Sequence, residues 1–150
     1  MWDSFSNDCT FLDIFTDRYK TEDGIDKDNS VYSYNATNYY IYQPLIASLV
    51  LETVIWESVT TNPTSAYSLI ELETTYNLAY TPEFAIYISL DGGEIFTQIT
   101  NQTLYKQVDN KYYFKGLISG LNGSNQIKAK ITCDSIIADI KIFAFALGVK

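Results

Sequence analysis

The chain has 150 residues, enough for one domain with a sizeable core, and its apolar fraction of 47% is ordinary for a globular protein. A net charge of −8 disfavours nucleic acids and anionic membrane surfaces as partners. The absence of histidine excludes a Ser-His-Asp or Cys-His centre and removes the commonest transition-metal ligand.

Residues 1–30 are predicted to form an acidic N-terminal arm, since they hold eight acidic residues against three basic ones, or −5 of the total charge. A short amphipathic helix, capped by Thr10 and stopped by Gly24, would place on one side Phe11, Leu12, Ile14, Phe15 and Tyr19. The apolar residues Trp2, Phe5, Phe11 and Phe15 need a surface to cover them. The arm therefore either lies loosely on the body or docks on a partner. Its first residues are not typical of a signal peptide.

Residues 31–150 show the two-residue period of β-strands, with one buried and one wetter face. The apolar positions expected inside are Leu51, Thr53 and Ile55; Ile70 and Leu72; Phe84, Ile86, Ile88 and Leu90; and Ile127, Ala129, Ile131 and Cys133. Turn signals separate these runs. The pattern predicts an all-β, jelly-roll-like antiparallel β-sandwich of about 8–10 strands, with a closed barrel as the second choice.

The stretch Ser89-Leu-Asp-Gly-Gly-Glu-Ile-Phe96 lies between two alternating runs. Asp-Gly is a strong hairpin signal, because glycine takes a positive φ at low cost. The hydroxyl of Ser89 and the carboxylate of Asp91 can bond nearby backbone amides. We therefore predict that Ser89, Asp91, Gly92 and Gly93 form a structural turn.

The last predicted strand has two apolar faces. Ile136, Ala138, Ile140, Ile142, Ala144 and Ala146 share one face under strict alternation. The other face becomes apolar at Phe143, Phe145 and Leu147, which predicts that the N-terminal arm or another subunit covers it.

Tyrosines cluster before residue 43 and again near residue 112. Rings on a strand face can stack on sugar rings while the hydroxyl stays in water. The candidate carbohydrate-binding residues are Tyr39, Tyr40, Tyr42, Tyr112 and Tyr113. For any one of them, ordinary packing at a sheet edge is the preferred interpretation. As a group they are the best candidate contact surface, whether for a glycan or for a protein.

The sequence predicts no cofactor, no metal and no enzymatic activity. Asp26-Lys-Asp-Asn-Ser30 resembles the first half of a calcium loop, but Val31 replaces the glycine and Thr37 replaces the final glutamate. Glu71 and Glu73 lie about 7 Å apart on one strand face, as glycosidase carboxylates can, yet alternating acids are commoner as a solvated face.

Two cysteines, Cys9 and Cys133, lie far apart in the sequence. Two buried thiols are the preferred interpretation, with one disulfide as the alternative.

Two segments together, residues 23–42 and residues 85–99, resemble β-sandwich modules in the virion structural proteins of tailed bacteriophages. The matching positions are Gly24, Ile25, Asp26, Ser30, Ser89, Asp91, Gly92 and Gly93. The resemblance implies a non-enzymatic tail, fibre or capsid-surface subunit, made in the host cytoplasm and carried in the virion.

In such a particle the expected partners are other virion proteins and further copies of the chain. The expected subunit contacts are Trp2, Phe5, Phe11, Phe15, Phe143, Phe145 and Leu147. A host surface glycan is a further expected partner. The alternative function is a carbohydrate-binding module that uses the tyrosines as its platform.

Overall fold

The computed structural model describes residues 13–44, 47–56, 62–74, 84–122, 126–133 and 140–150. In these residues the chain forms a 3-10 turn, η1 (Lys27–Asn29), and eleven β-strands. The strands are β1 (Asp13–Asp17), β2 (Ser33–Asn35), β3 (Tyr40–Tyr42), β4 (Leu49–Trp56), β5 (Ala66–Thr74), β6 (Ala85–Ser89), β7 (Thr97–Gln98), β8 (Thr103–Val108), β9 (Lys111–Ile118), β10 (Ile127–Cys133) and β11 (Ile140–Val149).

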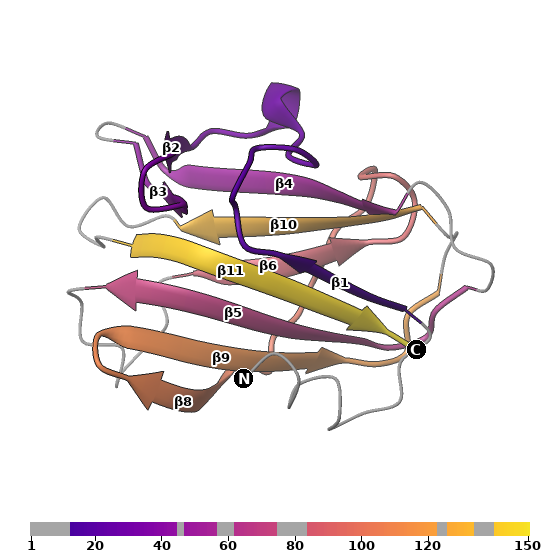
Figure 1. The fold of residues 1–150 in the computed structure, drawn as a ribbon. Helices are drawn as coiled ribbons and strands as arrows, with labels where there is room; N and C mark the ends of the chain where they lie inside the picture. The colour runs from indigo at the N-terminus through magenta and orange to yellow at the C-terminus, as the bar shows by residue number, and fades with distance from the viewer. Residues whose placement is uncertain (1–12, 45–46, 57–61, 75–83, 123–125, 134–139) are drawn as a thin grey trace.

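The strands build two antiparallel sheets that pack on each other (Figure 1). Sheet A has the order β2-β3-β11-β5-β9-β8, with β1 also paired to β11, and sheet B has the order β4-β10-β6-β7. Strands β3 to β6 alternate between the sheets, and β10 and β11 return between earlier strands, which is the wrapping of a jelly roll. The predicted all-β sandwich is confirmed. No helix within the described ranges is long and apolar enough to cross a membrane.

The core lies between the sheets and follows the two-residue period. The residues expected inside are buried in each of the four runs, from Leu51 at 0% exposure to Phe84, Leu90 and Ile55 at 7%. Some of their sequence neighbours, such as Val54 at 39%, reach solvent, whereas Leu69, Ser89 and Lys128 are buried on the opposite faces of their strands. Alternation on a strand with one dry face therefore predicts the buried side chains correctly here.

Strand β11 departs from strict alternation. Its register with β5 shifts between Ile142 and Ala144, so Phe143 is an extra residue in a β-bulge. Beyond the bulge the faces exchange, and Phe145 and Leu147 point into the core with 0% exposure. The prediction that Phe145 and Leu147 share a face away from Ile142 is wrong, because alternation cannot anticipate a bulge.

The expected subunit contacts are affected by this exchange. Phe145 and Leu147 have no exposed surface with which to meet another chain. Phe15 is half-buried against the core, and Phe143 lies on the outer side of sheet A. Trp2, Phe5 and Phe11 lie outside the described residues.

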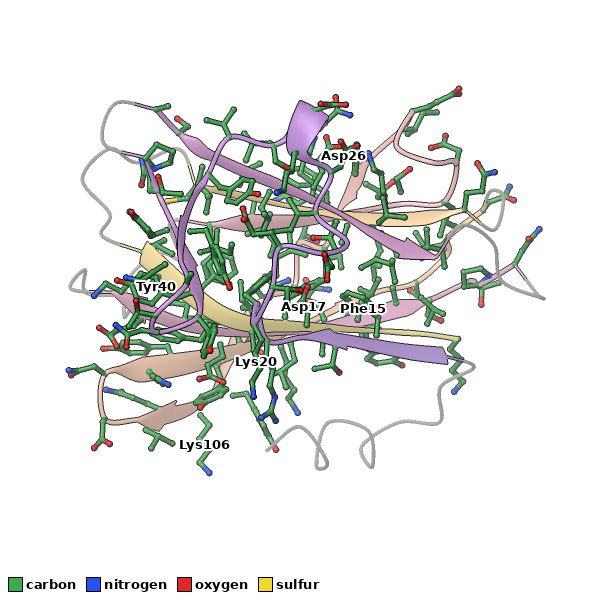
Figure 2. The ribbon with its side chains drawn as sticks, turned by 45° about the horizontal axis from the view of Figure 1, so that its top comes forward. Phe15, Asp17, Lys20, Asp26, Tyr40 and Lys106 are labelled. Atoms are coloured by element: carbon green, nitrogen blue, oxygen red, sulfur yellow. The ribbon has the colours of Figure 1, made fainter. Side chains whose placement is uncertain are left out.

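We call the described part of the N-terminal segment, residues 13–31, the leader. It pairs with strands of both sheets and does not form a separate arm. Residues 13–17 are strand β1, so the predicted amphipathic helix is wrong there; Phe15 pairs with Leu147 and takes the inward face. The chain then buries Tyr19 completely, and Ile25 and Val31 form bridges to the outer edge of β4. Figure 2 labels four residues along this path, Phe15, Asp17, Lys20 and Asp26. The loose arm ending at residue 30 is therefore wrong for the described leader.

An ion-pair cluster holds the leader on sheet B. The ammonium of Lys128 lies 2.5 Å from Asp26 Oδ2 and 2.9 Å from Glu52 Oε2, and its residue is only 8% exposed. Asp26 also accepts hydrogen bonds from the backbone and side-chain nitrogens of Asn29. The carboxylate of Asp26, the first oxygen ligand of the calcium-like stretch, is therefore already bound by Lys128 and Asn29.

The loop between β6 and β7 confirms the predicted structural turn. Ser89 Oγ accepts from Gly93 N at 2.9 Å and donates to Asp91 Oδ1 at 2.7 Å. Asp91 Oδ1 also accepts from the backbone N–H groups of Glu94 and Ile95. Gly92 and Gly93 have φ of 77° and 101°, which glycine adopts without strain. These bonds lower the pKa of Asp91 below its ordinary value.

Cys133 is buried, and its sulfur lies 3.7 Å from Gln43 Oε1. Cys9 lies outside the described residues, so the pairing of the two cysteines stays a prediction.

A polar side chain crosses the inner face of sheet A at Gly116. The amide Nε2 of Gln102 donates to Ser68 Oγ at 3.2 Å and to the carbonyl of Ile99 at 3.3 Å. A Cβ on Gly116 would lie 2.7 Å from Ser68 Oγ and would overlap the Gln102 amide. Glycine is needed here for space.

We predict that Gly116→Ala lowers the free energy of unfolding by about 1–3 kcal/mol, because the added methyl displaces the Gln102 amide. In a Gln102→Ala background the same change should cost less, since part of the obstacle is gone. Urea unfolding of the two single variants and the double variant measures this coupling. Strictly additive losses would contradict the proposed overlap.

We also predict an acid-sensitive contribution from Asp26, whose pKa the Lys128 and Asn29 hydrogen bonds lower to about 2. A lowered folded-state pKa contributes stability above the ordinary value of 3.8 and loses it as the pH falls toward 2. Asp26→Asn should therefore be less stable than the parent at neutral pH, with the difference shrinking between pH 4 and pH 2. Thermal unfolding across this range tests it, with Asp28→Asn, in the same turn, as the control. A difference that stays constant down to pH 2 would rule out this assignment.

Candidate functional site

The outer face of sheet A, turned away from sheet B, brings together aromatic and charged side chains from four neighbouring strands. Ile41 and Ile142 point into the core, so the residues that alternate with them point outward. We call this outward set the candidate binding face. It consists of Tyr40 and Tyr42 of β3, Lys141 and Phe143 of β11, Glu71 and Glu73 of β5, and Lys111 and Tyr113 of β9.

Three aromatic rings form one end of the binding face. The rings of Tyr40 and Tyr42 meet edge to face with centroids 5.6 Å apart and planes at 64°. The ring of Tyr40, labelled in Figure 2, lies 5.3 Å from that of Phe143. Such edge and tilted contacts are the favoured arrangement of aromatic quadrupoles. Tyr42 remains 37% exposed and is the ring most open to a ligand among these three.

Two ion pairs border these rings. Lys111 Nζ lies 3.2 Å from Glu71 and 4.3 Å above the centre of the Phe143 ring. Lys141 Nζ lies 3.7 Å from Glu73 and 5.3 Å from the centre of the Tyr40 ring. Each lysine thus bridges a carboxylate and a ring, and the four charges balance.

Tyr113 closes the far side of the face. It is 9% exposed, and burial together with the neighbouring Glu71 carboxylate raises its pKa above the ordinary value. The phenol therefore stays protonated at neutral pH and keeps its donor.

The structure brings together three of the five predicted carbohydrate-binding tyrosines: Tyr40, Tyr42 and Tyr113. Tyr39 is 43% exposed but occupies the β2–β3 turn with φ of 57°. Tyr112 packs against the core, because it alternates with Tyr113 on β9. Tyr112 is therefore wrongly placed in the predicted platform.

From the sequence alone, Lys111, Lys141 and Phe143 are not assigned to a ligand-binding face. Lys111 and Lys141 follow from the alternation of their strands once an exposed face is recognised. Alternation places Phe143 on the face opposite Ile142, where the structure has it, but the sequence-based expectation for it is a subunit contact. Glu71 and Glu73 do share one face as predicted, but each is held by its own lysine.

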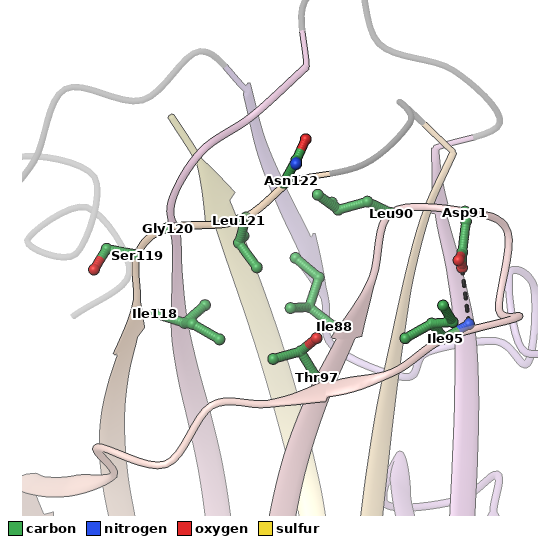
Figure 3. Close-up of a pocket in the computed structure, with 10 residues that line it drawn as sticks. All are labelled: Ile88, Leu90, Asp91, Ile95, Thr97, Ile118, Ser119, Gly120, Leu121 and Asn122. Carbon is green, nitrogen blue, oxygen red and sulfur yellow. Dashed lines mark hydrogen bonds between the residues drawn. The ribbon is translucent and has the colours of Figure 1, made fainter.

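A pocket of about 270 Å³ lies where the end of β9 faces β6 and β7 (Figure 3). It is lined by Ile88, Leu90, Asp91, Ile95, Thr97, Ile118, Ser119, Gly120, Leu121 and Asn122. Asp91 supplies the charge in this wall, but its Oδ1 is committed to the turn, including the bond from Ile95 N drawn in Figure 3. The pocket thus offers aliphatic and polar surface in similar measure.

Metal-binding chemistry finds no support within the described ranges, which hold no cluster of three or more His, Cys, Asp or Glu side chains suited to an ion.

No protein-family model matches the chain, and no curated protein matches it. Among solved structures, one similar chain is a family GH115 4-O-methyl-α-glucuronidase, BtGH115A, described as specific for decorated arabinogalactans. Its TM-score is 0.47 at 9% identity, and the match covers 93% of this chain but only 18% of that one.

Two smaller solved structures are also similar. One is TmCBM27, a carbohydrate-binding module described in terms of mannan recognition, with a TM-score of 0.45, 7% identity and coverage of 92% of this chain and 98% of that one. The other is CBM28, described as specific for non-crystalline cellulose, with a TM-score of 0.41, 11% identity and coverage of 81% and 78%. At these values the similarities identify neither a family nor a ligand for this chain.

Proposed function

We propose that this protein is a non-enzymatic glycan-binding module that uses the outer face of sheet A. The observation that carries the proposal is the arrangement of Tyr40, Tyr42 and Phe143 beside the Lys111–Glu71 and Lys141–Glu73 ion pairs. Sugars present apolar C–H faces and hydroxyl edges, and this face offers a partner for each.

The aromatic end supplies apolar contact. The exposed ring of Tyr42 can lie against the C–H face of a sugar ring, and its edge-to-face contact with Tyr40 holds it in place. A tyrosine ring has few rotamers to lose, so ordering it on binding costs little entropy.

The charged groups supply hydrogen bonds. A sugar hydroxyl both donates and accepts, so it can donate to Glu73 and accept from the ammonium of Lys141 or Lys111. Bonds to charged groups are stronger than bonds between neutral groups.

The ion pairs also favour binding over hydrolysis. Glu71 and Glu73, weighed above as glycosidase carboxylates, are held by Lys111 and Lys141, respectively. These ion pairs account for both glutamates without a catalytic role, because each carboxylate holds a lysine of the binding face in place.

The virion role expected from the phage resemblance stays a prediction. None of the three similar structures described above is named as a phage protein. Burial of Phe145 and Leu147 removes two residues from the expected subunit contact. Virion partners, further copies of the chain and a virion location likewise stay predictions.

We predict that Tyr42→Ala weakens binding to a recognised polysaccharide about five- to tenfold, because about 1 kcal/mol of ring contact is lost. Tyr42→Phe should keep most of the affinity. Affinity electrophoresis against a panel of soluble glucans, mannans and xylans finds the ligand, and calorimetry measures the variants.

Tyr87→Ala is the matched control, since Tyr87 lies opposite Lys130 on the neighbouring strand, as Tyr42 lies opposite Lys141, but on the outer face of sheet B. Equal losses in Tyr42→Ala and Tyr87→Ala would place the site elsewhere. Failure of the parent protein to bind any polysaccharide would overturn the proposed function.

A further inference from the structure

An exposed row of side chains crosses five strands of sheet A at right angles. The register pairs Tyr42 with Lys141, Lys141 with Glu73, Glu73 with Lys111, and Lys111 with Val108. Paired residues on antiparallel strands point to the same side, so these five side chains form one line. We call this line, Tyr42-Lys141-Glu73-Lys111-Val108, the cross-strand stripe.

The stripe is evenly accessible from end to end. Tyr42 and Val108 are 37% and 42% exposed, and the side chains of Lys141, Glu73 and Lys111 are 33%, 33% and 40% exposed. Four spacings between neighbouring strands make the stripe about 19 Å long. A single sugar ring cannot reach both ends.

The exposed fraction of the outward side chains decreases along the strands, away from the stripe. Next to the stripe, the Glu71 side chain is 12% exposed, Tyr113 is 9% and Ala144 is 2%. One row further on, Leu69 and Ala146 are completely buried. A chain-like ligand therefore finds its continuous contact across the strands and not along them.

The charge balance of the stripe favours an uncharged ligand. Lys141 and Lys111 are engaged by Glu73 and Glu71, so neither presents an uncompensated cation to a carboxylate or sulfate group. The chain as a whole carries −8 and repels polyanions at long range. Hydroxyl groups can use the paired ammonium and carboxylate groups without separating them.

We infer that the ligand is an uncharged glycan chain of several rings that lies across the strands of sheet A along the cross-strand stripe. The inference rests on the proposed function and adds to it the direction, length and charge of the ligand. The stacking ring of Tyr42 holds one end of the chain, the lysines and Glu73 bond its hydroxyls, and the apolar Val108 borders the other end.

The first test measures length and charge dependence on the full chain. Neutral glucan, mannan and xylan oligosaccharides, from one ring to a hexasaccharide, are titrated by calorimetry, with polygalacturonate as the polyanion. Affinity for the best neutral series should rise with length until the stripe is filled, and polygalacturonate should bind more weakly. A monosaccharide that binds as tightly as the hexasaccharide, or tighter binding of polygalacturonate, would overturn the inference while leaving glycan binding intact.

The second test probes the stripe on both sides of Glu73, its middle residue. Tyr42→Ala and Lys111→Met should each weaken hexasaccharide binding about fivefold, because the chain loses a contact at each side. Lys115→Met is the control on the same face of β9, about 13 Å further along the strand. Glu73→Gln keeps the side-chain shape and tests the middle of the stripe should Lys111→Met unfold.

The outcomes separate the two proposals. Loss of affinity in Lys115→Met without loss in Tyr42→Ala would mean that the chain lies along β9, which overturns the inference alone. No binding of any neutral or charged glycan by the parent protein would overturn the proposed function and the inference with it.

Discussion

The β-bulge at Phe143 decides which side chains of the central strand face the core. Strand β11 pairs with β1, β3 and β5, so it lies in the middle of sheet A. Without the extra residue, Ala144 and Ala146 would face sheet B, and Phe145 and Leu147 would face outward. Each buried phenylalanine or leucine contributes about 1.5–3 kcal/mol, so the bulge preserves a substantial part of the core. Phe143 itself lies outside, as alternation with Ile142 requires, and there Tyr40 and Lys111 contact it.

The leader ties the two sheets together. It enters sheet A as β1, buries Tyr19 between the layers and reaches the edge of β4. There Lys128 pairs with Asp26 and Glu52. The β6–β7 turn packs closely on this lysine, because a Cβ added to Gly93 would lie only 3.0 Å from Lys128 Cδ. A nearly buried ammonium needs two carboxylates and close packing to be tolerated. The segment that covers the edge of β4 thereby also shields its unpaired backbone groups.

The binding face combines a strongly acidic protein with a locally neutral surface. Aromatic groups come from β3, β9 and β11, carboxylates from β5 and ammonium groups from β9 and β11, so no single strand carries the site. Cross-strand pairing sets opposite charges side by side on β5, β9 and β11. The result is a cross-strand stripe with both hydrogen-bonding characters, whose two lysines are balanced by Glu73 within it and by Glu71 beside it. Such a surface suits hydroxyl-rich ligands better than ionic ones.

The sequence by itself determined the fold class, the buried faces of β4, β5, β6 and β10, and the turn at Ser89 and Asp91. These features depend on two-residue periodicity and on local side-chain bonds, which are written in adjacent residues. Alternation also requires Tyr112 and Tyr113 to point apart, but only the packing of sheet B on sheet A decides which of them faces the core between the sheets. The bulge at Phe143, the strand formed by the leader and the row from Tyr42 to Val108 depend on pairing between segments distant in sequence. Only the tertiary structure decided them, because register between strands is set by contacts that no single segment contains.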